Sequence, residues 1–334
     1  MKHQNTQKRF KPRSRKHLNA DALFNRLHVD FSKVSDCREG NIDISMADAL
    51  MSGFAMFSLK DPSLLSFDER RAADENLRTI YHIEDVPCDT QMRAILDEVN
   101  PEEFRPAYKN VFSELQRGKA LEPMVFFEGC YLLSLDGTGY FSSKKLSSDN
   151  CLEKVSKKTG EITYYQEMLG ASIVHPDFKE VIPLAPEFII KQDGQSKNDC
   201  ERNAAKRFFK KLRKDHPHLP LIITEDALSS NAPHITEAEK YNLHYILGVK
   251  NGDHAFLFNH VEEAQKRGET TQFELVDKDD PKIVHRFFFL NQVPLNESNQ
   301  DLLVNFLEYW EITPTKMQHF SWVTDFTVTK DNAY

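Results

Sequence analysis

Two short acidic segments contain the residues of this chain that are best suited to metal-dependent chemistry. In LLSLDGTGYFSS (132–143) an apolar run leads into Asp136 and a glycine-rich stretch, and in LPLIITEDALSS (219–230) another leads into Glu225 and Asp226. Carboxylates are the oxygen ligands that Mg²⁺ prefers, and two divalent ions about 3.5–4 Å apart can promote in-line displacement at a phosphodiester. Each segment alone is also typical of an ordinary turn, so only the pair points to chemistry.

The elements around these segments are expected to bring the carboxylates to one edge of a sheet. Leu132, Leu133 and Leu135 predict a short buried strand that ends at Asp136. Three β segments without an intervening helix indicate an antiparallel meander, and a helix and two more strands follow. This order resembles that of an RNase H-like sheet, and the resemblance implies that the first and fourth strands are neighbours. The later segments are ITYYQEMLGASIVH (162–175), VIPLAPEFII (181–190), the helix after QDGQSKND, LPLIIT before Glu225, and YILGVK (245–250).

The helix after QDGQSKND has one apolar face and several basic side chains on its other faces. Asn198 is a suitable N-cap, with Glu201 three residues later in the pattern of a capping box. Runs of charge on a helix are most often solvated surface, and contact with a DNA backbone is the second interpretation. The apolar face comprises Ala205, Phe208, Phe209 and Leu212, and the basic residues on the other faces include Arg202, Lys206, Lys210, Arg213 and Lys214.

The N-terminal arm has the opposite charge to the rest of the chain. The whole chain carries −8, and because residues 1–20 contribute seven positive charges and no negative ones, the remainder carries −15. A basic terminus acts either as an arm on nucleic acid or as a solubilising tail, and the sequence does not choose between them. The residues expected to contact DNA are Lys8, Arg9, Lys11, Arg13, Arg15 and Lys16.

Residues 21–118 are predicted to be mostly helical. Asp89 is expected to cap a helix that carries Met92, Ile95, Leu96 and Val99 on one face. Short helices in series fit a helix-turn-helix-like DNA-binding unit and equally a small helical bundle, and no recognition helix can be identified.

Residues 251–329 are predicted to be β-rich. The expected β segments are FLFNHV, TQFELVD, IVHRFFFLNQV, LLVNFLEYWEI and HFSWVTDFTVT, with one or two helical turns between Val261 and Gly268. His254, His260 and His285 lie here without metal-ligand spacing, so structural roles are expected for them.

Composition indicates a soluble cytosolic protein. Forty per cent hydrophobic residues allow a sizeable core, and no apolar run approaches the ~18 residues of a membrane span. The first 20 residues lack the apolar stretch of a signal peptide. Five widely spaced cysteines without a C-x-x-C pair argue against disulfides and against a cysteine-rich zinc site.

In this order and spacing the chain resembles the DDE-type transposases of bacterial insertion sequences, from about Leu18 to its end. The matching segments are LLSLDGTGYFSS, QDGQSKNDCERNAAKRF, LPLIITEDALSS, YILGVKNGDH and FSWVTDFTV. The resemblance implies an arm over 1–20, a helical DNA-binding region over 21–118, and an incomplete RNase H-like core over 119–334 with a β-rich insertion at about 251–329. The expected fold class is therefore α+β or α/β with a mixed sheet.

The resemblance also implies the chemistry. Asp136 and Asp226 would be the first two catalytic carboxylates and would bind Mg²⁺ or Mn²⁺ for DNA cleavage and strand transfer, with Glu225 as the competitor for the second position. The substrates would be the terminal inverted repeats of a mobile element and its target DNA. A homodimer in the cytoplasm, associated with the nucleoid and not with a membrane, is expected.

One family feature does not match. The segment with Tyr and Arg around a Trp, followed by a third carboxylate, is not found before Tyr334, and Glu308 and Glu311 lie in an apolar β-like segment that does not suit this role. The resemblance therefore predicts a crippled enzyme. The alternatives are a DNA-binding or dimerising regulator of transposition and, third, an unrelated RNase H-like nuclease.

Overall fold

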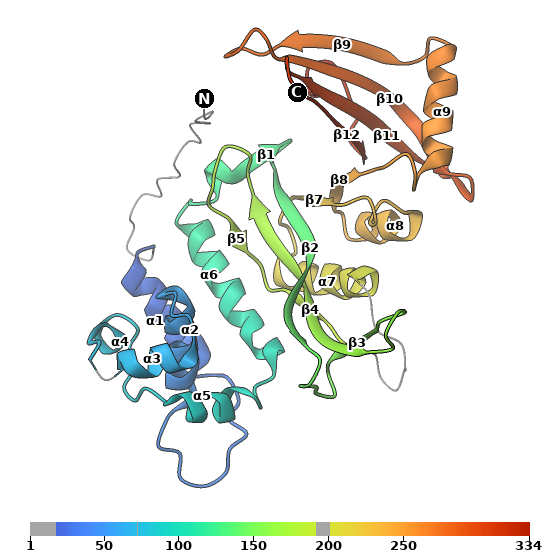
Figure 1. The fold of residues 1–334 in the computed structure, drawn as a ribbon. Helices are drawn as coiled ribbons and strands as arrows, with labels where there is room; N and C mark the ends of the chain where they lie inside the picture. Colours follow the sequence, from blue (N-terminus) through green and yellow to red (C-terminus); the bar gives the residue numbers. More distant parts are fainter. Residues whose placement is uncertain (1–17, 72, 192–200) are drawn as a thin grey trace. The chain divides into compact units, whose positions relative to one another are not determined.

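The computed structural model describes residues 18–71, 73–191 and 201–334 (Figure 1). The arm residues Lys8, Arg9, Lys11, Arg13, Arg15 and Lys16 and the predicted cap Asn198 lie outside these ranges. The chain divides into two compact units. One comprises Met1–Met124 and Asp177–Ala185, and the other comprises Val125–Pro176 and Pro186–Tyr334.

The first unit is mostly helical, as predicted. Its core forms where Met51, Phe67 and Met92 pack together, each at most 1% exposed. Asp30 is buried at the junction of the first and last long helices, where the Asn110 side-chain amide donates to both of its carboxylate oxygens. The elements are α1 (Ala20–Phe31), α2 (Met46–Ser58), α3 (Leu64–Arg71), α4 (Asn76–Thr79), α5 (Asp89–Leu96), η1 (Pro101–Phe104), α6 (Arg105–Arg117), η2 (Glu122–Met124) and the short β5 (Ile182–Pro183).

The predicted cap of α5 is wrong by one residue. Asp89 is the first helical residue and Cys88 is the N-cap. The reason is local, because Gln91 accepts a hydrogen bond from the Cys88 backbone N–H at 3.0 Å, which fixes the start of the helix there. Met92 and Ile95 are buried as expected, but the helix ends at Leu96 and leaves Val99 beyond it.

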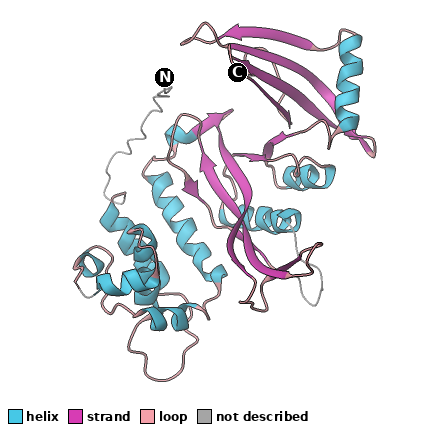
Figure 2. Cartoon of the chain, in the orientation of Figure 1, coloured by secondary structure: helices cyan, strands magenta, loops and turns pink. Residues whose placement is uncertain are grey.

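The second unit is built on one mixed sheet (Figure 2). Its main path has the strand order β3-β4-β2-β7-β8-β12-β11-β10-β9, with β1 added beside β2 and β6 beside β4. The pairs β2–β7 and β7–β8 are parallel, and the other pairs on this path are antiparallel. The strands are β1 (Val125–Phe127), β2 (Cys130–Ser143), β3 (Leu152–Val155), β4 (Ile162–Val174), β6 (Glu187–Ile189), β7 (Leu221–Glu225), β8 (His244–Gly248), β9 (Thr271–Val276), β10 (Val284–Asn296), β11 (Asn299–Ile312) and β12 (Met317–Thr324).

This arrangement confirms the predicted fold class. The strand after the meander and helix, β7, lies directly beside β2, so the first and fourth predicted strands are neighbours. Helix α7 (Glu201–Asp215) packs against β4 and β6, α8 (Ala232–Lys240) against β8, and α9 (Ala255–Lys266) against β10. Strand β12 pairs with β8, so the β-rich segment extends the same sheet.

Two predicted β segments are wrong. FLFNHV belongs to α9, because Leu257, Phe258, Val261 and Ala264 recur with helical spacing and are buried together. VIPLAPEFII contains only the short β5 and β6, because Pro183 and Pro186 lack the N–H that a continuous ladder requires.

Two further expectations can be compared with the structure. The four described cysteines, Cys37, Cys88, Cys130 and Cys151, are free thiols. Within the three described ranges, no helix is long and apolar enough to cross a membrane.

Candidate active site

Asp136 lies where β2 loses one of its two neighbours. The antiparallel strand β4 continues past it, with Asp136 opposite Gly170. The parallel strand β7 pairs with β2 only as far as Ser134 opposite Thr224. The prediction that the first strand ends at Asp136 is therefore wrong, because pairing with β4 keeps residues up to Ser143 extended. The carboxylate is nevertheless at a rim, since Leu133 and Leu135 before it are buried and Asp136 itself is exposed.

Asp226 is the first residue after β7. Asp136 and Asp226 each lie two residues beyond the last β2–β7 pair, Ser134 and Thr224, so the two side chains follow neighbouring parallel strands at the same level. Asp226 Oδ1 accepts a hydrogen bond from the Leu228 N–H at 2.9 Å, and the Asp226 carbonyl accepts one from the Ser229 N–H at 3.2 Å. This turn fixes the backbone at Asp226 while the side chain stays exposed.

Glu225, the competing candidate, is held inside the fold. Ser229 Oγ donates to its Oε2 at 2.6 Å, and His234 Nε2 lies 2.7 Å from its Oε1. The side chains of His234 and Glu225 are only 3% and 6% exposed. Both oxygens of Glu225 are therefore occupied by partners from the following loop and α8, whereas Asp226 faces solvent.

A third carboxylate, Glu201, lies at the same rim. It is the first residue of α7, and its carboxyl group packs against Gly137, next to Asp136. A Cβ atom at Gly137 would come within 2.1 Å of Glu201 Oε1, so the absence of a side chain there makes room for this carboxylate. The sequence predicts only a capping role for Glu201, because nothing local indicates that α7 begins beside β2.

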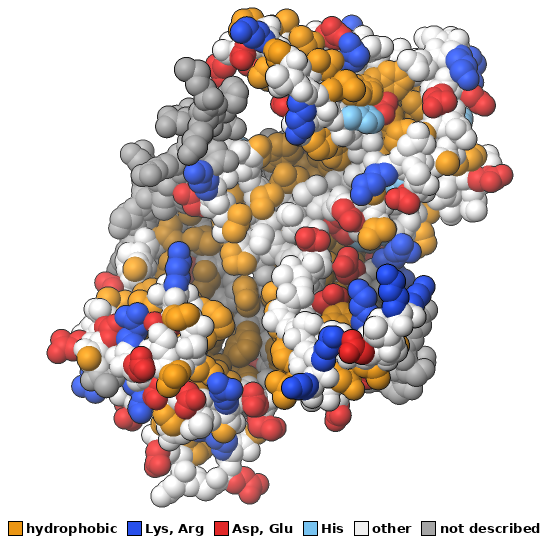
Figure 3. Space-filling view, viewed as in Figure 1, with side chains coloured by type: hydrophobic (Ala, Val, Ile, Leu, Met, Phe, Trp, Pro, Cys, Tyr) orange, Lys and Arg blue, Asp and Glu red, His pale blue; other side chains and the backbone are white. Residues whose placement is uncertain are grey.

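The site is strongly negative. The pKa of Glu201 is raised, first by partial burial of its carboxyl group and then by the charges of Glu167, Asp136, Asp226 and Glu225. Figure 3 shows Asp and Glu side chains gathered in this part of the second unit, with Lys and Arg side chains beside them over α7. Carboxylates that face each other repel, and a bound cation or protonation relieves this repulsion.

The donor set is suitable for a hydrated divalent cation. Among the described residues, no three Asp, Glu, His or Cys side chains are close enough together to hold one metal ion. Mg²⁺ usually keeps several waters and takes only one or two protein carboxylates, so Asp136 and Asp226 are sufficient donors in kind and number.

An open cavity of about 830 Å³ extends from Asp226 over the β-rich part of the same unit. Its lining includes both tryptophans of the chain, Trp310 and Trp322. Trp310 stacks on His319 with ring centroids 4.6 Å apart, and His319 Nε2 lies 2.9 Å from Glu308 Oε1. Burial raises the pKa of Glu308. Glu308 is thus paired within β11 and β12.

The three histidines considered from the sequence have different surroundings. His254 Nε2 lies 2.9 Å from the Ser230 carbonyl, and His285 lies within hydrogen-bond distance of Tyr309 and Asp277. His260 stacks on Phe256. These contacts fit the structural roles expected for His254 and His285.

Comparison with known proteins gives little further information. No protein-family model matches the chain, and no curated protein matches it. Among solved structures, it is similar to a cryo-EM structure of the piggyBac transposase synaptic complex with hairpin DNA, with a TM-score of 0.38 and 10% sequence identity. The match covers 94% of this chain and 61% of that one, so this chain spans about three fifths of the length of the piggyBac protein.

Proposed function

We propose that this protein is a metal-dependent DNA-cleaving and strand-transferring enzyme of the transposase type. The observation that carries the proposal is the position of Asp136 and Asp226, two exposed carboxylates at the same level after neighbouring parallel strands. Asp226 takes the second position in preference to Glu225, because both oxygens of Glu225 are already bonded within the fold.

Asp136 and Asp226 would hold Mg²⁺ or Mn²⁺ at this rim. A divalent cation bound there would neutralise charge on a phosphodiester and activate a water or a DNA 3′-hydroxyl for in-line attack. The role of the chain is to keep both carboxylates in place, since Asp136 is fixed by its pairing with β4 and Asp226 by its turn. The Glu201 carboxyl group, which packs against Gly137, would add to the negative charge that attracts a cation.

The substrate of this proposal is double-stranded DNA, at the ends of a bacterial mobile element and at its target site. The protein would act in the cytoplasm, and a second copy of the chain would bring the two ends together. The basic arm residues would add contacts to phosphates and make binding salt-dependent.

Nicking of a supercoiled plasmid in Mn²⁺ or Mg²⁺ tests the proposal. Because the third carboxylate of the family pattern is missing, the wild-type chain is expected to convert supercoiled DNA to open circles only slowly, and Asp136→Asn and Asp226→Asn are expected to abolish this. Glu225→Gln is the matched control, because it removes one negative charge at the adjacent position and should keep nicking at a temperature where it is folded. Equal nicking by all four proteins, or none by the wild type in either metal, would reject the proposed function.

A further inference from the structure

The basic side chains of α7 fall into two groups, and the first group has structural contacts. Arg207 Nε lies 2.8 Å from Glu187 Oε1, and Lys211 Nζ lies 2.8 Å from Glu187 Oε2, a carboxylate that is only 4% exposed. Arg213 donates to the carbonyls of Leu219 and Tyr241 at 2.7 and 2.6 Å. These three cations hold α7 to β6 and to the loops around α8.

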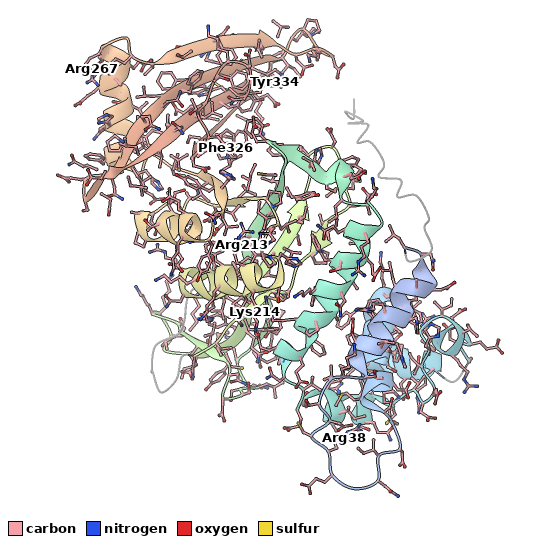
Figure 4. The ribbon with its side chains drawn as sticks, turned by 180° about the vertical axis from the view of Figure 1, so that it is seen from behind. Arg38, Arg213, Lys214, Arg267, Phe326 and Tyr334 are labelled. Atoms are coloured by element: carbon pink, nitrogen blue, oxygen red, sulfur yellow. The ribbon has the colours of Figure 1, made fainter. Side chains whose placement is uncertain are left out.

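The second group has no such contacts. Arg202, Lys206, Lys210 and Lys214 are all exposed. In the parts of the chain that the structure describes, none of the four side chains forms an ion pair or a hydrogen bond. Figure 4 labels Arg213 and Lys214, which lie on different sides of α7, so neighbouring residues belong to different groups. We name Arg202, Lys206, Lys210 and Lys214 the α7 stripe.

The α7 stripe has a regular geometry. Its members are four residues apart, so successive charges rise by about 6 Å along the helix and the stripe is about 18 Å long. Like charges at this spacing weaken a helix instead of supporting it. Acidic residues at alternate positions would have removed this repulsion, so the unpaired row is better explained by a partner with a regular row of negative charges.

The position of the α7 stripe connects it with the candidate active site. Arg202 directly follows Glu201, whose carboxyl group packs against Gly137 beside Asp136. The carboxylates at this rim repel a phosphodiester, so DNA can approach only if cations nearby offset that repulsion. One DNA strand carries a phosphate about every 3.4 Å along the axis, so a row of about 18 Å matches about five phosphates.

From these observations we infer that the α7 stripe binds the phosphate backbone of double-stranded DNA and leads it to Asp136 and Asp226. The inference builds on the proposed function, and it assigns to Arg202, Lys206, Lys210 and Lys214 the contacts to the substrate next to the cleavage position. These contacts read no sequence, because they reach only phosphates.

The test is the salt dependence of DNA binding by the full chain in EDTA. The probe is a fluorescein-labelled blunt duplex of random sequence, and affinity is measured by anisotropy between about 50 and 200 mM KCl. The variant replaces the four stripe residues by glutamine, a good helix former. If each cation contacts one phosphate, the slope of log K against log salt should become less steep by about 0.9 per residue, or 3–4 in total.

The matched control carries Lys266→Gln, Lys278→Gln, Lys282→Gln and Lys316→Gln, four exposed lysines of the β-rich part. It has the same net charge as the stripe variant, and its slope should stay within about one of the wild-type value. A wild-type slope for the stripe variant, or an equal loss in both variants, overturns the inference. Arg202→Gln and Lys206→Gln as single changes, each expected to reduce the slope by about 0.9, keep the test valid if the quadruple variant does not fold.

Failure of this inference can be distinguished from failure of the proposed function. If the wild-type chain never nicks DNA but the stripe variant binds DNA with a less steep salt dependence, the DNA-binding role of the α7 stripe is supported and the proposed enzymatic function is rejected. If the wild-type chain nicks DNA but the stripe variant binds DNA with an unchanged salt slope, the proposed enzymatic function is supported and the DNA-binding role of the α7 stripe is rejected.

Discussion

Glu225 and Asp226 are adjacent in the chain, yet the structure predicts opposite consequences when each loses its charge. In Glu225→Gln, one carboxylate oxygen becomes an NH₂ group that faces a donor, either the Ser229 hydroxyl or the His234 Nε2–H. In Asp226→Asn, Oδ1 still accepts the Leu228 N–H and the side chain remains in solvent.

The magnitudes follow from burial. A hydrogen bond to a charged group contributes about 1.5–3 kcal/mol, and the Glu225 and His234 side chains, at 6% and 3% exposed, are not screened by water. Glu225→Gln should therefore lower the free energy of unfolding of the second unit by about 2 kcal/mol, or its melting temperature by about 4–8 °C. Asp226→Asn should change it by no more than about 0.5 kcal/mol.

Urea unfolding followed by tryptophan fluorescence measures this difference in the relevant unit. Both tryptophans of the chain, Trp310 and Trp322, lie in the second unit, so their emission reports on the unit that contains Glu225 and Asp226. The unfolding measurement is paired with the nicking assay. We predict that Glu225→Gln is less stable than the wild type and still nicks DNA, whereas Asp226→Asn is as stable as the wild type and does not nick DNA. The opposite pattern would show that the two residues have been assigned to the wrong roles.

Two further predictions concern Gly137 and Asp277. Gly137→Ala should displace the Glu201 carboxyl group, since the new Cβ would lie 2.1 Å from Glu201 Oε1. It should therefore weaken Mn²⁺ affinity in the wild-type background and have no effect in a Glu201→Ala background. A loss of Mn²⁺ affinity of equal size in both backgrounds would refute this. Hydrogen bonds from His285 and then from the Asp280 and Asp279 N–H groups lower the pKa of Asp277 to about 2. Because this pKa is below the ordinary value of 3.8, the stabilisation is present above that value and is lost as the pH falls through about 2. The difference in unfolding free energy between wild type and Asp277→Asn should therefore shrink over this range, and a difference that is constant with pH would argue against the His285 contact.

The sequence predicted the frame of the candidate site but not its details. Apolar runs that end in acid predicted which strands carry Asp136 and Asp226, and the order of elements predicted that these strands are neighbours. The resemblance favours Asp226 over Glu225, but the physical reason could not be derived from the sequence, because it depends on His234, which reaches Glu225 only after α8 packs. The proximity of Glu201 to Asp136 likewise exists only in three dimensions.

The errors in the predicted strands have similar physical origins. Asp136 and Gly137 have the composition of a turn, yet they remain extended because β4 continues beside them. FLFNHV has the composition of a strand, and the helix is identified only when the period of its buried residues is extended to Ala264. In both cases the neighbouring element decides the conformation.

The central claim is that Asp136 and Asp226 together hold divalent cations. Titration of Mn²⁺ into the full chain, with free Mn²⁺ followed by electron paramagnetic resonance, tests it without any assumption about the DNA substrate. We predict a site in the wild type that Asp136→Asn and Asp226→Asn each weaken at least about tenfold, which is about 1.4 kcal/mol, and that Glu225→Gln retains. Equal Mn²⁺ binding by the wild type and both aspartate variants would contradict the claim.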